Sequence, residues 1–267
     1  MIISRGDSAM AAPRAARLVR LAPCRRRPVA RAFGHLSSWT PAACAGGTLW
    51  RRAKATARGQ RVRESGMPPV DYWEELLHPE PTLDALGFTS GRHVRAVEFG
   101  CGYGTFTVPA HGLAGTETSA SFWAWIQVAQ RVQKLHTFDI EEHMVETSRQ
   151  RLAAAGLEAR VELEVRDVLA QGYGLEAEAD AVLLMNILHC QEPVQMLRQA
   201  AELLEDQGLV YAIHWRYDES TPRGPPMKIR PRPEQLADWA MQTGLLEVER
   251  GPIDCPPWHY GWTFRRA

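Results

Sequence analysis

An apolar segment that runs into three alternating glycines constrains the fold of this chain more than any other feature. The segment covers residues 94–99, includes Glu98, and is followed by Gly100, Gly102 and Gly104. This pattern predicts a buried parallel strand that breaks into a tight turn and opens a helix. Glycine lets the backbone turn sharply and lets a ligand lie against the main chain, and the helix N-terminus offers free N–H groups to an anionic ligand group.

Strand and helix patterns alternate along the rest of the chain. Short helices at 71–77 and 82–86 are expected to precede the first strand as a lid, with Tyr72 and Trp73 either facing a pocket or packing on the sheet. Further strands are expected at 134–138, 160–166, 179–184, 208–213, 245–249 and 260–264, and helices at 128–132, 142–155, 194–204 and from 232 to Gly244. We therefore expect an α/β fold: a three-layer, Rossmann-like sheet of seven strands that ends in an antiparallel hairpin.

Polar residues stand where successive predicted parallel strands end. Asp139 ends the second strand, Asp167 the third and Asn186 the fourth, and Glu98 lies at the end of the first. Ligands of open α/β sheets bind at this carboxyl edge. A lone Asp at a strand end is more often a helix cap or turn residue, but four polar positions in order favour a binding site.

The run Glu98-Phe99-Gly100-Cys101-Gly102-Tyr103-Gly104 resembles the first motif of class I S-adenosylmethionine-dependent methyltransferases, an acid and an apolar residue before G-x-G-x-G. It differs from the dinucleotide-binding G-x-G-x-x-G because the third glycine comes one residue early. The resemblance covers residues 62–267 and implies S-adenosylmethionine as the cofactor and methyl transfer as the activity. The alternatives are a catalytically inactive S-adenosylmethionine-binding protein and a nicotinamide-dependent oxidoreductase.

The resemblance also implies roles for individual residues. Asp139 would accept the two ribose hydroxyls, Asp167 would accept from the adenine amine beside the N–H of Val168, and Asn186 would lie between methyl donor and substrate. The predicted cofactor-binding residues are Glu98, Gly100, Cys101, Gly102, Gly104, Asp139, Ile140, Asp167, Val168 and Asn186.

Two histidines follow predicted strands at the same edge and are the catalytic candidates. His189 follows the fourth strand and His214 the fifth, and either can serve as a base for a hydroxyl, phenol or amine acceptor. His259 is a third candidate, and for each the alternative is a histidine held by hydrogen bonds in the core. Trp215, Tyr217 and Trp258 are expected to line the acceptor pocket, with the Pro-rich segment 219–233 as its rim.

The charge is divided unevenly along the chain. Residues 1–66 carry thirteen Arg and one Lys against Asp7 and Glu64, a net charge of +12, and residues 67–267 carry −12. We expect a basic, disordered extension over 1–60 and a methyltransferase domain over 61–267. The extension is either a poorly ordered segment without a function, a mitochondrial transit peptide or a nucleic-acid-binding arm.

The acidic domain argues against nucleic acid as the substrate and favours a small-molecule acceptor, with its identity and the methylated atom open. No apolar run approaches the roughly 20 residues that span a membrane, so no membrane partner is expected. A cytoplasmic location is expected, or a mitochondrial one if the extension is a transit peptide. The oligomeric state is not predicted.

Residues 111–127 interrupt the expected spacing between the first helix and the second strand. Removing them joins two flanks that both fit one helix, so we interpret the segment as an insertion, either an error of the gene model or a genuine loop. Five cysteines are scattered at 24, 44, 101, 190 and 255 without metal-ligand spacing, which predicts no metal site and a reducing compartment. Cys101 is expected to be a small residue in a crowded turn rather than a nucleophile.

Overall fold

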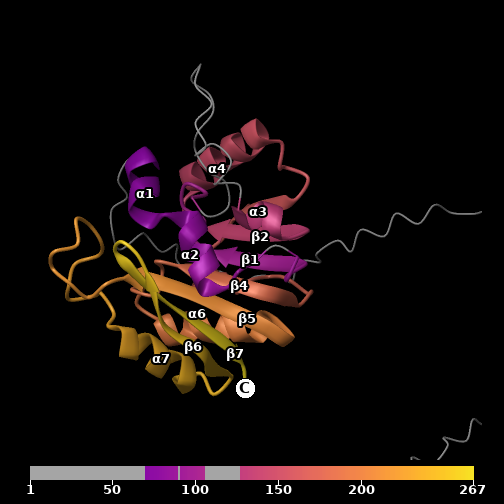
Figure 1. Cartoon of the computed structure of the whole chain (residues 1–267). Helices are drawn as coiled ribbons and strands as arrows, with labels where there is room; N and C mark the ends of the chain where they lie inside the picture. Colours follow the sequence, from indigo (N-terminus) through magenta and orange to yellow (C-terminus); the bar gives the residue numbers. More distant parts are fainter. Residues whose placement is uncertain (1–69, 90, 106–126) are drawn as a thin grey trace, which may run out of the picture. The chain divides into compact units, whose positions relative to one another are not determined.

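The computed structural model describes residues 70–89, 91–105 and 127–267 (Figure 1). All of them belong to one compact unit, Thr48–Ala267. The predicted extension over 1–60 lies outside the described residues, and so does the predicted insertion at 111–127 apart from Gln127.

Seven strands form one mixed sheet in the order β3-β2-β1-β4-β5-β7-β6. The first five pair in parallel, whereas β7 is antiparallel to both β5 and β6. This arrangement confirms the predicted Rossmann-like sheet with a C-terminal antiparallel hairpin. The strands are β1 (Arg95–Phe99), β2 (Lys134–Asp139), β3 (Val161–Val165), β4 (Ala179–Met185), β5 (Leu204–Trp215), β6 (Leu246–Cys255) and β7 (His259–Arg266).

Helices cover both faces of the sheet and bury an apolar cluster on each. Helices α5, α6 and α7 pack with one cluster, and α1 to α4 contribute to the other. In Figure 1, α2 lies in front of the strands and α7 lies along the hairpin of β6 and β7. The helices are α1 (Val70–Leu77), α2 (Pro79–Leu86), α3 (Gln127–Arg131), α4 (Glu142–Ala155), α5 (Val168–Gln171), α6 (Pro193–Leu203) and α7 (Pro233–Gln242).

Several elements differ from the sequence prediction. Strand β5 begins at Leu204, four residues before its expected start at 208, because Leu204 pairs with Ala179 before an irregularity shifts the register to Ala181 and Leu209. Strand β6 extends to Cys255, past its expected end at 249, and α2 begins at Pro79 instead of 82. Helix α5 was not predicted at all. It has four residues, which is too short to show a helical period.

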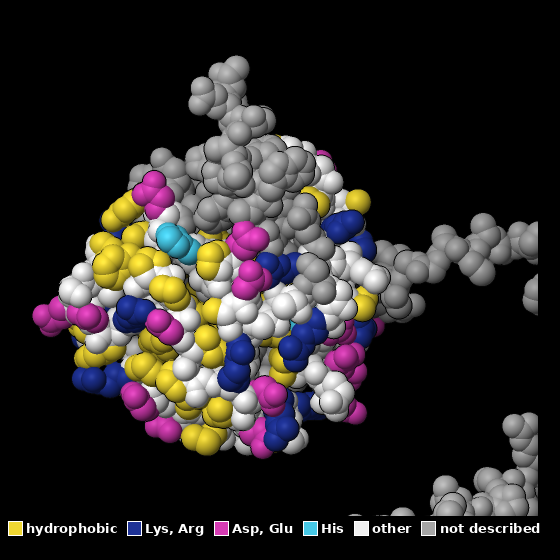
Figure 2. All heavy atoms as spheres, viewed as in Figure 1, with side chains coloured by type: hydrophobic (Ala, Val, Ile, Leu, Met, Phe, Trp, Pro, Cys, Tyr) yellow, Lys and Arg dark blue, Asp and Glu magenta, His cyan; other side chains and the backbone are white. Residues whose placement is uncertain are grey.

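Acidic and basic side chains are interspersed on the described surface that Figure 2 shows, and this face carries no continuous basic area among its described atoms. Over the same described ranges, no helix is both long enough and apolar enough to cross a membrane.

Candidate cofactor and acceptor site

The glycine run forms a turn that is pinned to the end of strand β2. The N–H groups of Gly100 and Cys101 both donate to the carbonyl oxygen of Phe138, at 2.9 and 2.8 Å. Gly100, Gly102 and Gly104 have φ values of 80°, 55° and 72°, which side-chain-bearing residues rarely adopt. A Cβ on Gly100 would also lie 2.7 Å from Cδ1 of Ile187. Backbone conformation therefore favours glycine at all three positions, and a larger residue at Gly100 would also displace the Ile187 side chain.

Asp139 fastens this turn to the sheet. Its buried carboxylate accepts from the N–H of Gly102 at 2.8 Å through Oδ2 and from the N–H of Glu141 at 3.0 Å through Oδ1. Ile140 lies between these contacts and is half-buried. Each carboxylate oxygen can accept more than one hydrogen bond, so the predicted contact to ribose hydroxyls stays chemically open while Asp139 also shapes the turn.

Glu98 and Cys101 lie buried beside the turn. Glu98 is 1% exposed, and its Oε2 accepts from the hydroxyl of Thr137 at 3.3 Å. The Cys101 thiol lies 3.8 Å from Oγ of Ser148. Burial, with smaller contributions from Asp139 and Glu98, raises the pKa of the Cys101 thiol far above its ordinary value. A thiol that stays protonated is a poor nucleophile, which agrees with the packing role expected for it.

Asp167 caps a helix. Its Oδ1 accepts from the N–H of Ala170 at 2.9 Å, so it is the N-cap of α5, and Val168 begins that helix with a buried side chain. Its position at the end of β3 is the predicted one. The cap is the structural role that a lone Asp at a strand end most often has, and the predicted contact with adenine remains a prediction.

Asn186 follows β4 in a left-handed conformation, with φ of 57°. Its N–H donates to the carbonyl of Ile213 at 3.1 Å. Within the described residues, neither the buried Oδ1 nor the buried Nδ2 of its side chain has a hydrogen-bond partner. Unpartnered buried amides are costly and strained residues gather at functional sites, so this amide is suited to bind a ligand group.

His189 and His214 form a pair. Nδ1 of His189 lies 3.3 Å from Nε2 of His214, and the two rings are close to perpendicular at 76°. His214 is fully buried, and its pKa is held well below 6.5, first by burial and then by the neighbouring His189. His214 is therefore neutral at pH 7, whereas His189 is half-buried and lines a pocket.

His259 lies on the opposite face of the sheet from this pair. His214 faces Tyr260 across the β5–β7 ladder, whereas the next pair, Trp215 and His259, points to the other side. There the His259 ring lies 4.3 Å from the Trp215 ring, which also packs against Trp73 at 6.0 Å. The sequence placed His259 and Trp215 at the acceptor site with the other two histidines; strand alternation separates them from the pocket that His189 lines.

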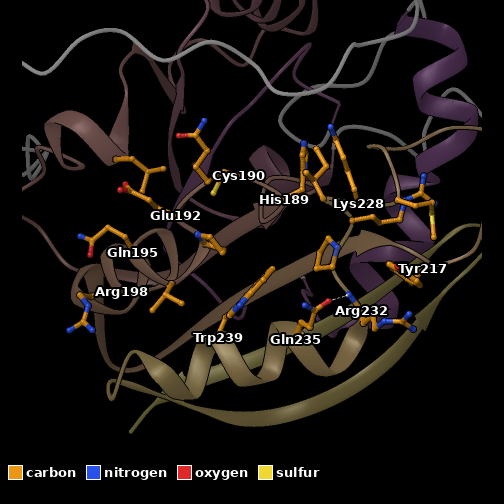
Figure 3. Close-up of a pocket in the computed structure, with 18 residues that line it drawn as sticks. His189, Cys190, Glu192, Gln195, Arg198, Tyr217, Lys228, Arg232, Gln235 and Trp239 are labelled. Carbon is orange, nitrogen blue, oxygen red and sulfur yellow. Dashed lines mark hydrogen bonds between the residues drawn. The ribbon is translucent and has the colours of Figure 1, made fainter.

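The pocket that His189 lines has a volume of about 1090 Å³ and lies between the segment after β4 and the start of α7. In Figure 3, Gln235 and Trp239 rise from α7 into this space, and His189 and Cys190 lie on the opposite wall. Part of the predicted rim, 227–232, does line it, and so does Tyr217, but Trp258 is not among the described lining residues.

One buried residue that sequence reasoning missed shapes this rim. Arg230 is 7% exposed, and its guanidinium lies inside the loop formed by residues 216–231. It donates to the carbonyls of Arg216, Asp218, Arg223 and Pro225 and to the hydroxyl of Thr221, at 2.6 to 3.3 Å. The sequence shows only an arginine before Pro231 in a Pro-rich segment, and that pattern says nothing about burial.

Comparison with known proteins agrees with the fold and the motif. A family model described as a methyltransferase domain matches residues 97–210. No curated protein sequence matches the chain significantly.

Among solved structures, an S-adenosylmethionine-dependent methyltransferase from Aquifex aeolicus is 18% identical, with a TM-score of 0.55, over 73% of this chain and 92% of its own. The N-methyltransferase NodS from Bradyrhizobium japonicum WM9 is 15% identical, with a TM-score of 0.52, over 71% and 96%. The CcbJ methyltransferase from Streptomyces caelestis is 17% identical, with a TM-score of 0.52, over 71% and 90%.

These likenesses establish the fold, and the family model adds that the strands carrying the glycine turn, Asp139, Asp167 and Asn186 form a methyltransferase domain. The chain thus contains a region that matches a methyltransferase domain, on the fold of S-adenosylmethionine-dependent methyltransferases, and S-adenosylmethionine is the cofactor that this match indicates.

Proposed function

We propose that this protein transfers a methyl group from S-adenosylmethionine to a small molecule that binds in the pocket between His189 and α7. The observation that carries the proposal is the His189–His214 pair, because a neutral, buried imidazole orients a second imidazole at the pocket wall. The cofactor, when bound, supplies an electrophilic methyl group. The residues of the chain bind the cofactor and the acceptor, align the acceptor with the methyl group and remove the proton of the acceptor.

The residues at the carboxyl ends of β1, β2 and β4 fit the cofactor. Three glycines at positive φ leave the main chain open to a ligand, and Glu98 and Asp139 supply carboxylates that attract ammonium and hydroxyl groups. The amide of Asn186, unpartnered among the described residues, supplies both a donor and an acceptor. We assign cofactor binding to these positions.

His189 is the proposed general base and His214 is a positioning residue. The proposed arrangement places the hydrogen of neutral His214 on Nδ1, so that its Nε2 accepts from Nδ1–H of His189. His189 then has no hydrogen on Nε2, and that nitrogen can take a proton from the acceptor. In this arrangement His214 holds His189 in the tautomer that is basic at Nε2.

No feature of the described residues favours an oxidoreductase or an inactive binder. Small-molecule transfer agrees with the net charge of −12 over residues 67–267, because a nucleic-acid-binding surface is expected to be basic.

Titration with S-adenosylhomocysteine tests the cofactor assignment. Isothermal calorimetry on the full chain is expected to give micromolar binding, and Asp139→Asn is expected to weaken it at least tenfold, or by about 1.4 kcal/mol, because Asp139 shapes the glycine turn. Asp180→Asn is the matched control. Asp180 also accepts from two backbone N–H groups, those of Val94 and Arg95, but at the opposite edge of the sheet.

The control variant is expected to lose stability and keep its affinity. A folded wild-type protein that does not bind S-adenosylhomocysteine would exclude the proposed function. Equal loss of affinity in both variants would contradict the assignment of Asp139 to the cofactor site.

A further inference from the structure

The proposed acceptor pocket carries an excess of positive charge. Four of its described lining residues are cationic, Arg198, Lys228, Arg230 and Arg232, and Glu192 is the one carboxylate among them. The surrounding sequence has the opposite character, since residues 67–267 carry a net charge of −12. The pocket is therefore a local reversal of charge within an acidic domain, and such a reversal draws anions.

Three of these cations are not neutralised by the protein. Within the described residues, Arg198, Lys228 and Arg232 form no ion pair with any carboxylate, whereas the Arg230 guanidinium is fully engaged by carbonyl and hydroxyl oxygens. Arg232 is instead oriented by Tyr217, over whose ring its guanidinium lies at 3.9 Å. A stacked guanidinium is held in one plane and keeps its N–H donors available for an anion.

Apolar side chains form the rest of the pocket. Trp239 rises from α7 into its centre in Figure 3, and Leu169, Met227 and Ile229 also line it. In the same view Arg198 lies at one end, and Arg232 and Tyr217 lie at the other. An apolar middle between cationic ends fits a ligand with a hydrophobic body and an anionic group.

We propose that the methyl acceptor is an organic anion, a carboxylate or a phosphate monoester carried on an apolar body. Arg232 and Lys228 bind the anionic group, Trp239 packs on the body, and the nucleophilic group faces His189. This inference rests on the proposed function, because it takes the pocket to be the acceptor site. The charge of the pocket thereby defines the chemical class of its acceptor.

Three probes of one shape separate the possibilities: 4-hydroxybenzoate, 4-hydroxyphenyl phosphate and the neutral 4-hydroxybenzamide. Each is titrated into the full chain by calorimetry, with and without saturating S-adenosylhomocysteine. At least one anion is expected to bind at least tenfold more tightly than the amide, and the tighter of the two identifies the anionic group. K228Q and R232Q are each expected to weaken binding of the anion about three- to tenfold and to leave binding of the amide unchanged.

Arg223→Gln is the matched control, because Arg223 is an exposed arginine of the same loop outside the described pocket lining. Three outcomes would overturn the inference: equal affinity for the anions and the amide, no binding of either anion, or a loss of affinity for the anion in R223Q as large as in the pocket variants. Failure of the proposed function has a different signature: the anions still bind, but S-adenosylhomocysteine does not.

Discussion

The two parts of the ligand-binding edge are stabilised by different means. Around the glycine turn, backbone N–H groups bond to one neighbouring strand: Gly100 and Cys101 donate to the carbonyl of Phe138, and Gly102 donates to the carboxylate of Asp139. Around the pocket, the loop 216–231 has short backbone turns of its own and closes around the Arg230 guanidinium. The first part depends on backbone conformation and one carboxylate, and the second on one guanidinium.

This difference changes what each part tolerates. A turn whose donors are main-chain N–H groups can keep its bonds after most side-chain substitutions, Asp139 apart, but not after a change that its φ angles forbid. A loop that closes on one guanidinium tolerates changes along most of its length and depends on that group, because the guanidinium joins acceptors from across the loop and the carbonyl of buried Pro225 accepts from it twice. Three substitutions test this contrast.

Arg230→Met is expected to have the largest effect. It removes the donors that join the carbonyls of Arg216, Asp218 and Pro225, and should lower the free energy of unfolding by about 3 kcal/mol. Urea unfolding followed by circular dichroism measures the loss. Because the glycine turn has separate bonds, the folded fraction should still bind S-adenosylhomocysteine.

Arg230→Lys and Arg223→Met complete the series. Lysine keeps the charge but has three donors from one point and cannot span the loop, so it should recover less than half of the loss. Arg223 is exposed, and its replacement should change stability by no more than about 0.5 kcal/mol. Full recovery by lysine would show that charge, rather than the planar set of donors, organises the loop.

Gly100→Ala is the corresponding test of the glycine turn. Alanine at this position has an unfavourable φ of 80°, and its Cβ would lie 2.7 Å from Cδ1 of Ile187. The substitution should lower the free energy of unfolding by about 2 kcal/mol and weaken the binding of S-adenosylhomocysteine at least tenfold. Gly156→Ala is the control, since Gly156 ends α4 at a φ of 67° with no atom within 4 Å of an added Cβ. It should cost about 1 kcal/mol and leave affinity unchanged. Equal affinities in the two variants would mean that the turn does not contact the cofactor.

The same contrast explains what the sequence could predict. The strands that lead to Glu98, Asp139, Asp167 and Asn186 were predicted within one or two residues, because buried parallel strands are continuous apolar runs. The turn was predicted because three alternating glycines are typical of a backbone with positive φ angles. Order along the chain then put their ends at one edge of the sheet. Local patterns are sufficient where local backbone geometry builds the site.

The acceptor part could not be predicted in the same way. His259 was grouped with His189 and His214 because all three follow or begin strands, but antiparallel register decides which face each side chain takes. That register depends on pairing between β5 and β7, more than 40 residues apart. Arg230 was missed because its partners are carbonyl oxygens, which every residue has and no sequence pattern marks.

His259 provides the smallest of the three tests. Its buried ring has a pKa of about 3, lowered from 6.5 first by burial and then by Arg216. The unfolded chain takes up a proton below pH 6.5 and the folded chain does not, so falling pH favours unfolding by about 1.4 kcal/mol per unit between pH 6.5 and about 3. Between pH 7 and 5, this one residue should lower the free energy of unfolding by about 2 kcal/mol.

His259→Phe should remove that part of the acid sensitivity, since phenylalanine does not titrate and can pack against Trp215 in the same place. Urea unfolding at pH 7 and pH 5 measures the difference for each protein. His143→Phe is the control, because the His143 side chain is 68% exposed beside Glu141 and its loss should leave the wild-type pH dependence unchanged. His93 and His214 also have lowered pKa values and lie against or in β5, so acid should weaken this part of the sheet further. An unchanged pH dependence in His259→Phe would show that the ring reaches water in the folded protein.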